Sequence, residues 1–382
     1  MKVLLANEWW PPDVSGGTEL FLARLRGWLE RERHEVRVVA AKYKADDGNA
    51  LRVASSPIKF AHFYQWPLLT MHWNYHNDGL VKIIKDFGYG VDLFHLNNIW
   101  HLGMSPIRAA RELGKPALLD IHDWWPLCFR KDMMYAGREL CSGPEPAKCS
   151  RCLFRTSAFS GLVGKEIRER SSLLEGHTMI THSGYVAKRF PGAKVVPYSY
   201  SGSVARKARK LEDGQLHILF LGRLQKNKGA DMLDAVSAGL ERRNVEHLID
   251  VGGNGPVRPS GKNMRLHGFV QGEKKVKLLE LADMLLVPSR WPEPFGMVVL
   301  EAMANGIPVV ASKVGGLGEL VEGQGCGLTA SPESGELADA VMRMVDSPAL
   351  YARCSAAGLK NIRLFGENKV MSRYEKEYVK MT

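Results

Sequence analysis

Short apolar segments alternate with amphipathic helical segments along this chain of 382 residues, and the alternation runs twice. In the first half the strand-like segments are 3–7, 35–41, 91–97, 116–122, 178–183 and 194–198. After a polar, basic stretch they resume at 216–223, 245–253, 263–269, 282–289 and 307–312. Such alternation predicts parallel, doubly wound sheets. We therefore expect two α/β domains, at 1–196 and 197–362, and a final helix at 363–382 that packs back toward the first domain.

Glycines and charged residues in the loops after these strands suit a phosphorylated ligand. Two doubly wound domains in tandem are expected to enclose a cleft, and ligands of such sheets bind beyond the carboxyl ends of the strands. Gly16 and Gly17 precede the first helix and could admit a phosphate, although a plain turn is the alternative. Arg223 and Lys228 follow the strand at 216–223, where a guanidinium and an ammonium suit a diphosphate. Two ordinary surface cations are the alternative for this pair.

The segment VGGNGP (251–256) loosely resembles a dinucleotide-binding fingerprint. Pro256 and Pro259 interrupt the helix that such a fingerprint requires, which argues against a dehydrogenase. We interpret its glycines, including Gly253, as allowing a ligand to approach the backbone closely.

The most specific stretch is SRWPEPFGMVVLEAMANGIPVVAS (289–312). A tight loop containing Glu293 leads into a helix that is expected to begin near Met297. The first amides of a helix have no helical partners and carry about half a positive charge, which favours a phosphate. Glu293 would lie beside the group attached to that phosphate. Glu301, with Val298 one helical row below it, could reach ribose hydroxyls. The alternatives are a helix cap for Glu293 and a surface position for Glu301.

Together these motifs resemble glycosyltransferase family 4, whose members have the GT-B fold of two Rossmann-like domains facing across a cleft. EPFGMVVLE is similar to the family's motif of two glutamates separated by seven residues, and GRLQKNKG resembles its diphosphate-binding strand end. SGGTE and LLDIHDWWPLC resemble its glycine loop and its His-containing loop, and GNGP, HGFV and PVVASKVGGLGELV follow in the family's order. The chain departs from many relatives at the domain junction, where it has VVPYSYS (195–201).

The resemblance implies a role for each matching residue. The diphosphate would be bound by Arg223 and Lys228, and the donor sugar would be contacted by Glu293 and faced by His122. The ribose would be bound by Glu301, and the base would be flanked by the backbone near Val270. The implied catalytic residues are His122, Arg223, Lys228 and Glu293, and the implied donor-binding residues are Gly16, Gly17, Gly222, Gly253, Val270, Phe295, Gly296, Met297, Val298 and Glu301.

The resemblance also implies the reaction. A sugar would be transferred with retention of configuration from a nucleotide-diphosphate sugar, with UDP favoured over GDP, and the leaving phosphate would help to remove the acceptor proton. Fixed cations and helix amides aimed at the leaving charge would lower the barrier. The resemblance also implies that no catalytic metal is needed. The alternatives are a nucleotide-sugar epimerase of the same fold and a non-catalytic nucleotide-sugar-binding protein. An epimerase would convert the donor without any acceptor.

Four of the six cysteines cluster in the loop 128–152 with the spacing C-x12-C-x7-C-x-x-C. They are Cys128, Cys141, Cys149 and Cys152. Cysteine clusters in a cytosolic protein favour metal over disulfide. A structural zinc ion with four cysteine ligands would stiffen the loop. An iron–sulfur cluster uses the same ligands and is the less favoured metal interpretation. Metal-free thiols or disulfides are the remaining alternatives.

The acceptor is open among a glycan, a lipid-linked and a small-molecule acceptor, in polysaccharide or glycoconjugate biosynthesis. Aromatic residues and histidines concentrate at 59–76, and we predict that this stretch forms part of the acceptor site or a membrane-facing edge. The formal net charge of +11 allows peripheral association with anionic membrane. No apolar run reaches the ~18–20 residues that span a bilayer, and no signal peptide or nucleic-acid-binding motif is recognised. We expect a cytoplasmic enzyme, with peripheral attachment to the inner face of the membrane as an option.

Overall fold

The structure is a computed structural model that describes residues 1–14, 16–41, 50–53, 77–205, 207–211 and 214–382. The chain divides into two compact units. Unit 1 comprises Met1–His182, Ala187–Val196 and Met371–Thr382, and unit 2 comprises Ser183–Val186 and Pro197–Val370. The aromatic stretch at 59–76, for which we predict an acceptor or membrane role, lies outside the described residues.

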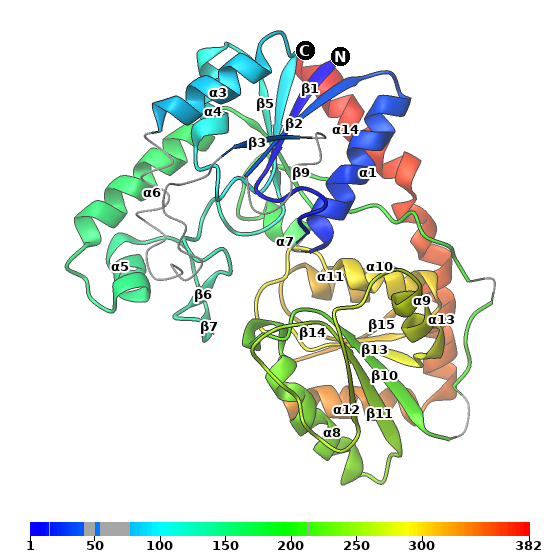
Figure 1. The fold of residues 1–382 in the computed structure, drawn as a ribbon. Coiled ribbons are helices and arrows are strands. Elements are labelled where there is room, and N and C mark those ends of the chain that lie inside the picture. The colour runs from blue at the N-terminus through cyan, green and yellow to red at the C-terminus, as the bar shows by residue number, and fades with distance from the viewer. Residues whose placement is uncertain (15, 42–49, 54–76, 206, 212–213) are drawn as a thin grey trace. The chain divides into compact units, whose positions relative to one another are not determined.

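Unit 1 is built on a parallel sheet with the strand order β3-β2-β1-β4-β5-β8-β9. Its strands are β1 (Lys2–Asn7), β2 (Glu35–Ala41), β3 (Leu51–Val53), β4 (Leu93–Leu96), β5 (Ala117–Ile121), β8 (Thr178–Thr181) and β9 (Lys194–Val195). Its helices are α1 (Gly17–Arg31), α3 (Asp78–Gly88), α4 (Ser105–Glu112), α5 (Pro146–Phe154) and α6 (Ser160–Leu174). The helix α14 (Glu367–Met381) lies beside α1, while α3 and α4 lie on the other side of the sheet (Figure 1).

Unit 2 is built on a second parallel sheet, with the strand order β12-β11-β10-β13-β14-β15. Its strands are β10 (Leu216–Leu221), β11 (His247–Gly252), β12 (Met264–Gly268), β13 (Met284–Val287), β14 (Val309–Ser312) and β15 (Gly327–Ala330). Its helices are α8 (Leu233–Glu241), α9 (Gly272–Leu281), α10 (Met297–Ala304), α11 (Gly316–Gln324), α12 (Ser334–Val345) and α13 (Pro348–Asn361). Three short 3-10 helices, η1 (Lys226–Lys228), η2 (Ala230–Met232) and η3 (Ile362–Phe365), complete it, and α7 (Gly184–Ala187) begins in its short N-terminal segment.

The predicted strand segments all coincide with strands of the two sheets, so the prediction of two parallel α/β domains is confirmed. The central strands are apolar because helices cover both faces, and β1, β4 and β5 are buried almost throughout. In unit 2, apolar side chains of α8 and α12 meet those of β10, β11 and β13 in one core cluster. A small antiparallel hairpin, β6 (Met134–Tyr135) with β7 (Glu139–Leu140), lies outside the sheets.

The glycines after β10 and β11 are required by close contact between neighbouring backbones. A Cβ atom on Gly253 would lie 1.7 Å from the carbonyl oxygen of Gly222, and one on Gly255 would lie 2.2 Å from that of Leu224. Gly253 also has a φ of 153°. Packing within unit 2 therefore explains these glycines, and contact of Gly253 with a ligand stays a prediction.

We predict that Gly253→Ala lowers the free energy of unfolding by at least about 2 kcal/mol, because the new methyl group meets backbone that cannot move aside. Gly335→Ala is the matched control, because a Cβ atom there meets nothing within 4 Å and the residue lies in α12. The control should be neutral or slightly stabilising. Urea unfolding of both variants measures the difference, and equal midpoints would contradict the prediction.

Candidate active site

An ion pair joins two loops that follow neighbouring strands of unit 2. Lys228 ends η1 after β10, and Glu293 lies in the loop after β13. Lys228 Nζ is 2.6 Å from Glu293 Oε1, which also accepts a hydrogen bond from Ser289 Oγ at 2.7 Å. The strand order reverses between β10 and β13, and doubly wound sheets bind ligands at such a switch point.

Burial shapes the charges of this pair. Burial lowers the pKa of the Lys228 ammonium and the nearby Arg223 lowers it further, while Glu293 opposes both. Burial alone would raise the pKa of Glu293, but Lys228 and Ser289 hold it below its ordinary value. The Lys228 ammonium lies 4.7 Å from the centre of the Trp291 ring, and its side chain keeps 19% exposure. The pair is thus enclosed but can be reached from solvent.

The loop between Glu293 and α10 is held by the start of α11. Gly316 N donates to Glu293 O at 2.6 Å, and a Cβ atom on Gly315 would lie 2.3 Å from the same oxygen. Gly296 has a φ of 104° and precedes α10, which begins at Met297 as predicted. Within the described residues, no acceptor takes a hydrogen bond from the N–H of Phe295, Gly296 or Met297. These amides are therefore available to an anion.

The other predicted donor-binding residues of unit 2 lie on the surrounding loops and helices. Arg223 is exposed just beyond β10 and close enough to influence Lys228. Glu301 lies in α10, but its Oε1 atom is 2.5 Å from Lys275 Nζ of α9, so it is already paired within the unit. Val270 is buried beside Gly252. Val298 is half-buried on α10, and Gly222 donates its N–H to Gly252 O at 3.0 Å.

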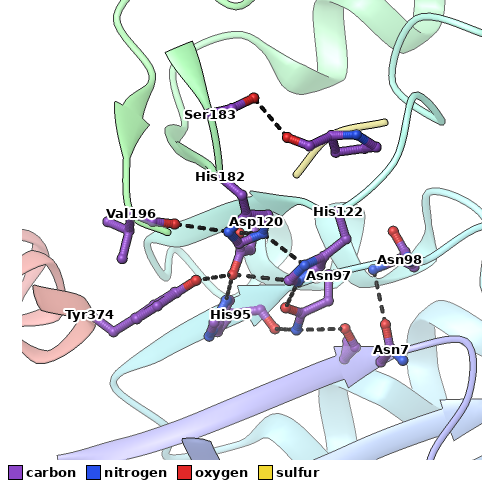
Figure 2. Close-up of polar contacts among 12 residues, drawn as sticks. Asn7, His95, Asn97, Asn98, Asp120, His122, His182, Ser183, Val196 and Tyr374 are labelled. Atoms are coloured by element: carbon purple, nitrogen blue, oxygen red, sulfur yellow. Dashed lines mark hydrogen bonds and ion pairs between the residues drawn. The ribbon is translucent and has the colours of Figure 1, made fainter. Parts of the chain in front are cut away.

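In unit 1 the predicted catalytic residue His122 belongs to a buried polar cluster at the carboxyl ends of β4, β5 and β8 (Figure 2). His122 Nε2 lies 2.9 Å from Asn97 Oδ1, and His122 Nδ1 lies 2.8 Å from His182 Nε2. His182 Nδ1 lies 2.8 Å from the carbonyl oxygen of Val196. The two imidazole rings are stacked with centroids 4.6 Å apart.

These partners fix the number of protons on the two histidines. The Val196 oxygen and Asn97 Oδ1 can only accept, and Asn97 Nδ2 donates to backbone carbonyls, so each ring donates its outer N–H. One further proton is needed between His182 Nε2 and His122 Nδ1. Three protons on two imidazoles give the pair one positive charge. Burial lowers the pKa of His122 to about 3, which disfavours a second proton on that ring.

Asp120 supplies the opposite charge. Its Oδ1 atom is 3.2 Å from His182 Nε2, and its Oδ2 atom accepts a hydrogen bond from Tyr374 Oη of α14 at 2.8 Å. His95 Nε2 is 3.4 Å from the same Oδ2 atom, and His95 Nδ1 is 2.7 Å from Tyr378 Oη. Burial alone would raise the pKa of Asp120, but the histidines hold it well below its usual range. Asp120 is therefore an ionised buried carboxylate.

The sequence analysis did not single out Asp120, His182, His95 or the tyrosines of α14. Asp120 and His182 stand in or directly after predicted strands, so polar residues at the ends of apolar strands were a usable signal. The tyrosines approach from the distant C-terminal helix, and no local pattern connects them with β5.

Asp120, His122 and His182 are also the one set of three potential metal ligands, among the residues that the structure describes, whose ligand atoms all lie within 4.8 Å of one another. The nitrogens of His182 and His122 are 2.8 Å apart, a hydrogen-bond distance. Two nitrogens on one tetrahedral zinc ion, each about 2.0–2.1 Å from the metal, would be about 3.3 Å apart. The set therefore fits a proton-linked network better than a metal centre.

The glycine loop and the two tryptophans that come soon after His122 have structural partners in unit 1. Gly16 N donates to Glu19 Oε2 at 2.7 Å, and α1 begins at Gly17, so the Glu19 side chain caps the backbone at the start of this helix. Trp124 and Trp125, which follow His122, are each 1% exposed. They belong to the core of unit 1.

Two family models match the chain, one in each half. The model described as "Glycosyltransferase Family 4" matches residues 15–190, and the model described as "Glycosyl transferases group 1" matches residues 203–361. An uncharacterized glycosyltransferase of Methanocaldococcus jannaschii is 26% identical over 362 residues, which cover 87% of this chain and 86% of the relative. A D-inositol 3-phosphate glycosyltransferase of Streptomyces griseus is 35% identical over 316 residues, which cover 72% of this chain and 64% of the relative.

Solved structures extend the likeness to the fold. The crystal structure of Anabaena HepE in complex with UDP-glucose matches with a TM-score of 0.69 and 18% identity, and the match covers 100% of both chains. At this identity the match shows the fold alone. None of the described helices has the length and apolar character needed to cross a membrane.

We predict that Asp120→Asn lowers the free energy of unfolding at pH 7 by about 3–5 kcal/mol, because it leaves a buried cationic histidine pair without its counter-charge. The pKa of Asp120 is depressed in the folded chain. Its stabilisation is therefore complete above the unfolded pKa of about 3.9 and is lost as the pH falls further. The free energies of unfolding of the wild type and the variant, measured from unfolding curves, should therefore converge in acid.

The control for this prediction is Asp86→Asn, which removes one partner of an exposed ion pair with Lys82. Its cost should stay below about 1 kcal/mol at any pH. If Asp120→Asn costs no more than Asp86→Asn at pH 7, the charge assignment is wrong.

Proposed function

The chain belongs to glycosyltransferase family 4 and has the GT-B fold, and from this premise we propose that it transfers a sugar from a nucleotide-diphosphate sugar with retention of anomeric configuration. The proposed acceptor is a glycan, a lipid-linked saccharide or a small molecule. The observation that carries the donor part of the proposal is the Lys228–Glu293 pair directly before the open amides of α10.

The Lys228–Glu293 pair can serve both the diphosphate and the sugar of the donor. Lys228 supplies a cation to the diphosphate, and the N–H groups of Phe295, Gly296 and Met297 supply donors to the same oxygens. Glu293 supplies a carboxylate to the hydroxyls of the donor sugar. On this proposal the donor replaces a contact that the two side chains make with each other at 2.6 Å. Pairing before the donor arrives keeps a buried carboxylate compensated.

The bond-breaking step places negative charge on the leaving diphosphate. Fixed cations and amides aimed at that charge stabilise the transition state more than the ground state. The exposed Arg223 adds a second cation beside Lys228. A leaving phosphate oxygen then takes the proton of the acceptor hydroxyl as the new glycosidic bond forms, so that no protein nucleophile is required.

His122 is a poor candidate for the base in this step. Both ring nitrogens are engaged, by Asn97 and by His182, and burial lowers the pKa of His122 to about 3. A base with so low a pKa accepts few protons at neutral pH. We propose that His122 faces the donor sugar as a neutral ring that Asn97 and His182 hold rigidly.

A UDP-sugar is the proposed donor, with a GDP-sugar as the second choice. The support is the fold shared with Anabaena HepE, a protein whose solved structure contains UDP-glucose. A thermal-shift screen across UDP-, GDP- and ADP-sugars tests the choice, because a ligand of the folded chain raises its Tm by mass action. A screen in which no donor raises the Tm would contradict the proposal. Conversion of a donor to its epimer without any acceptor would favour the epimerase instead.

We predict that Lys228→Ala lowers kcat by about 10²–10³, because one group that stabilises the leaving charge is lost. Adding Arg223→Ala should abolish measurable turnover. Lys226→Ala is the control, since Lys226 is an exposed lysine of the same 3-10 helix. The measurement is release of nucleoside diphosphate under saturating donor, with unfolding curves to verify that each variant is folded. Turnover of Lys228→Ala within tenfold of the control would argue against this role.

A further inference from the structure

The four clustered cysteines line one cavity of unit 1. Cys128, Cys141, Cys149 and Cys152 come from the loop after β5, the strand end of the β6–β7 hairpin and the helix α5, and they border the same cavity. All four are free thiols. The first and last of them are 24 positions apart in the sequence, so the fold of this loop, rather than simple proximity in the chain, brings them together.

The segment that holds them has almost no core of its own. From Tyr135 to Phe159 the only buried residue is Ser150, and Leu140 and Phe159 are exposed large hydrophobic residues. A segment of this length that buries so little apolar surface cannot offset the entropy of its ordering. Small folds with this deficit are usually held by disulfides or by a metal.

The backbone of the segment is also unusual. Four non-glycine residues between positions 131 and 155, Lys131, Met133, Ala136 and Arg155, have φ values between 50° and 63°. Only two other non-glycine residues in the described part of the chain, Arg33 and Asn244, have a positive φ. Residues in this conformation cost free energy and persist where surrounding contacts fix them. A cross-link at the cysteines would supply that constraint.

Hydrogen-bond donors and cations lie close to the sulfurs. Ala136 N donates to Cys152 Sγ at 3.2 Å, and Glu145 N donates to Cys149 Sγ at 3.4 Å. Arg130 and Lys148 line the cavity. Arg170 is buried, which lowers the pKa of its guanidinium, and electrostatic interaction with Cys128 and Cys149 opposes this shift. One divalent ion with four thiolates carries a net charge of −2, and these cations would offset it.

We propose that Cys128, Cys141, Cys149 and Cys152 bind one structural zinc ion. Each thiol gives up a proton to solvent, and four Zn–S bonds form at about 2.3 Å. Sulfurs around a tetrahedral zinc ion are about 3.8 Å apart. No three of the four sulfurs lie within 4.8 Å of one another in the structure, so the hairpin and α5 must draw together on binding.

The site would anchor the loop against the strand ends of unit 1. Lys131, three residues after Cys128, pairs with Glu8 beyond β1 at 3.0 Å. Arg170 of α6 donates to the carbonyl oxygen of Trp125 at 2.8 Å, and its guanidinium lies 4.1 Å from the centre of the Phe129 ring. The zinc ion would thus stabilise the chain directly after His122 without taking part in the chemistry.

The test measures metal and stability in the full chain, so its result does not depend on the proposed transferase activity. Protein purified under reducing conditions should contain about one zinc per chain by elemental analysis. The apo protein, prepared with a chelator under reducing conditions, should unfold at a Tm about 5 °C lower or more, and added zinc should restore it. Titration with Co²⁺ alone should give the intense visible bands of tetrahedral cobalt thiolate.

Cys149→Ser with Cys152→Ser should lose the zinc, whereas Cys326→Ser with Cys354→Ser removes the two buried cysteines outside the cluster and should keep it. Zinc that persists in the first variant would place the metal elsewhere, for instance at Asp120, His122 and His182, and would overturn the proposal. Three other results would also overturn the proposal. They are iron with a visible charge-transfer spectrum, disulfides in the unreduced protein, and less than about 0.2 zinc per chain even after incubation with zinc. Because the metal content and the cobalt spectrum are read on wild type, a variant that fails to fold leaves the test intact.

Discussion

Each unit keeps a carboxylate out of water, and a buried carboxylate is tolerated only beside a cation that stays with it. In unit 1 the carboxylate is Asp120 and the cation is the protonated pair His122–His182. In unit 2 it is Glu293 and the cation is Lys228. Both lie at the carboxyl ends of central parallel strands, where side chains, helix starts and glycine turns converge.

The two pairs differ in what they can do. The unit 1 cluster is closed: its groups bond to one another, to backbone and to the tyrosines of α14, so it fixes the ends of β4, β5 and β8 and the C-terminal helix. The unit 2 pair is open on one side, because Lys228 keeps some exposure and the first amides of α10 have no acceptor in the described residues. A ligand with a diphosphate can enter this second arrangement and exchange one ionic contact for another.

The sequence was sufficient to predict the architecture, because strand burial in parallel sheets produces apolar runs such as those at 3–7 and 284–287 that local patterning reveals. It also indicated Lys228 and Glu293, because both follow predicted strands and match family motifs. It could not reveal that these two side chains contact each other, nor that Tyr374 reaches Asp120 from 254 positions away. Those contacts depend on strand order and helix placement. The sequence analysis interpreted Gly253 of VGGNGP as allowing a ligand to approach. The structure adds that packing against the Gly222 carbonyl group also requires a glycine at this position.

The central claim is that the open pair of unit 2 binds a diphosphate. Calorimetric titration of the chain with UDP and with uridine at the same ionic strength tests it most directly, because the two ligands differ only in the group that Lys228 and the α10 amides would bind. The account predicts that UDP binds at least about 100-fold more tightly than uridine, equivalent to roughly 2.7 kcal/mol, and that added salt weakens this preference. Equal affinity for the two ligands, or a preference for UDP that survives Lys228→Ala unchanged, would contradict it.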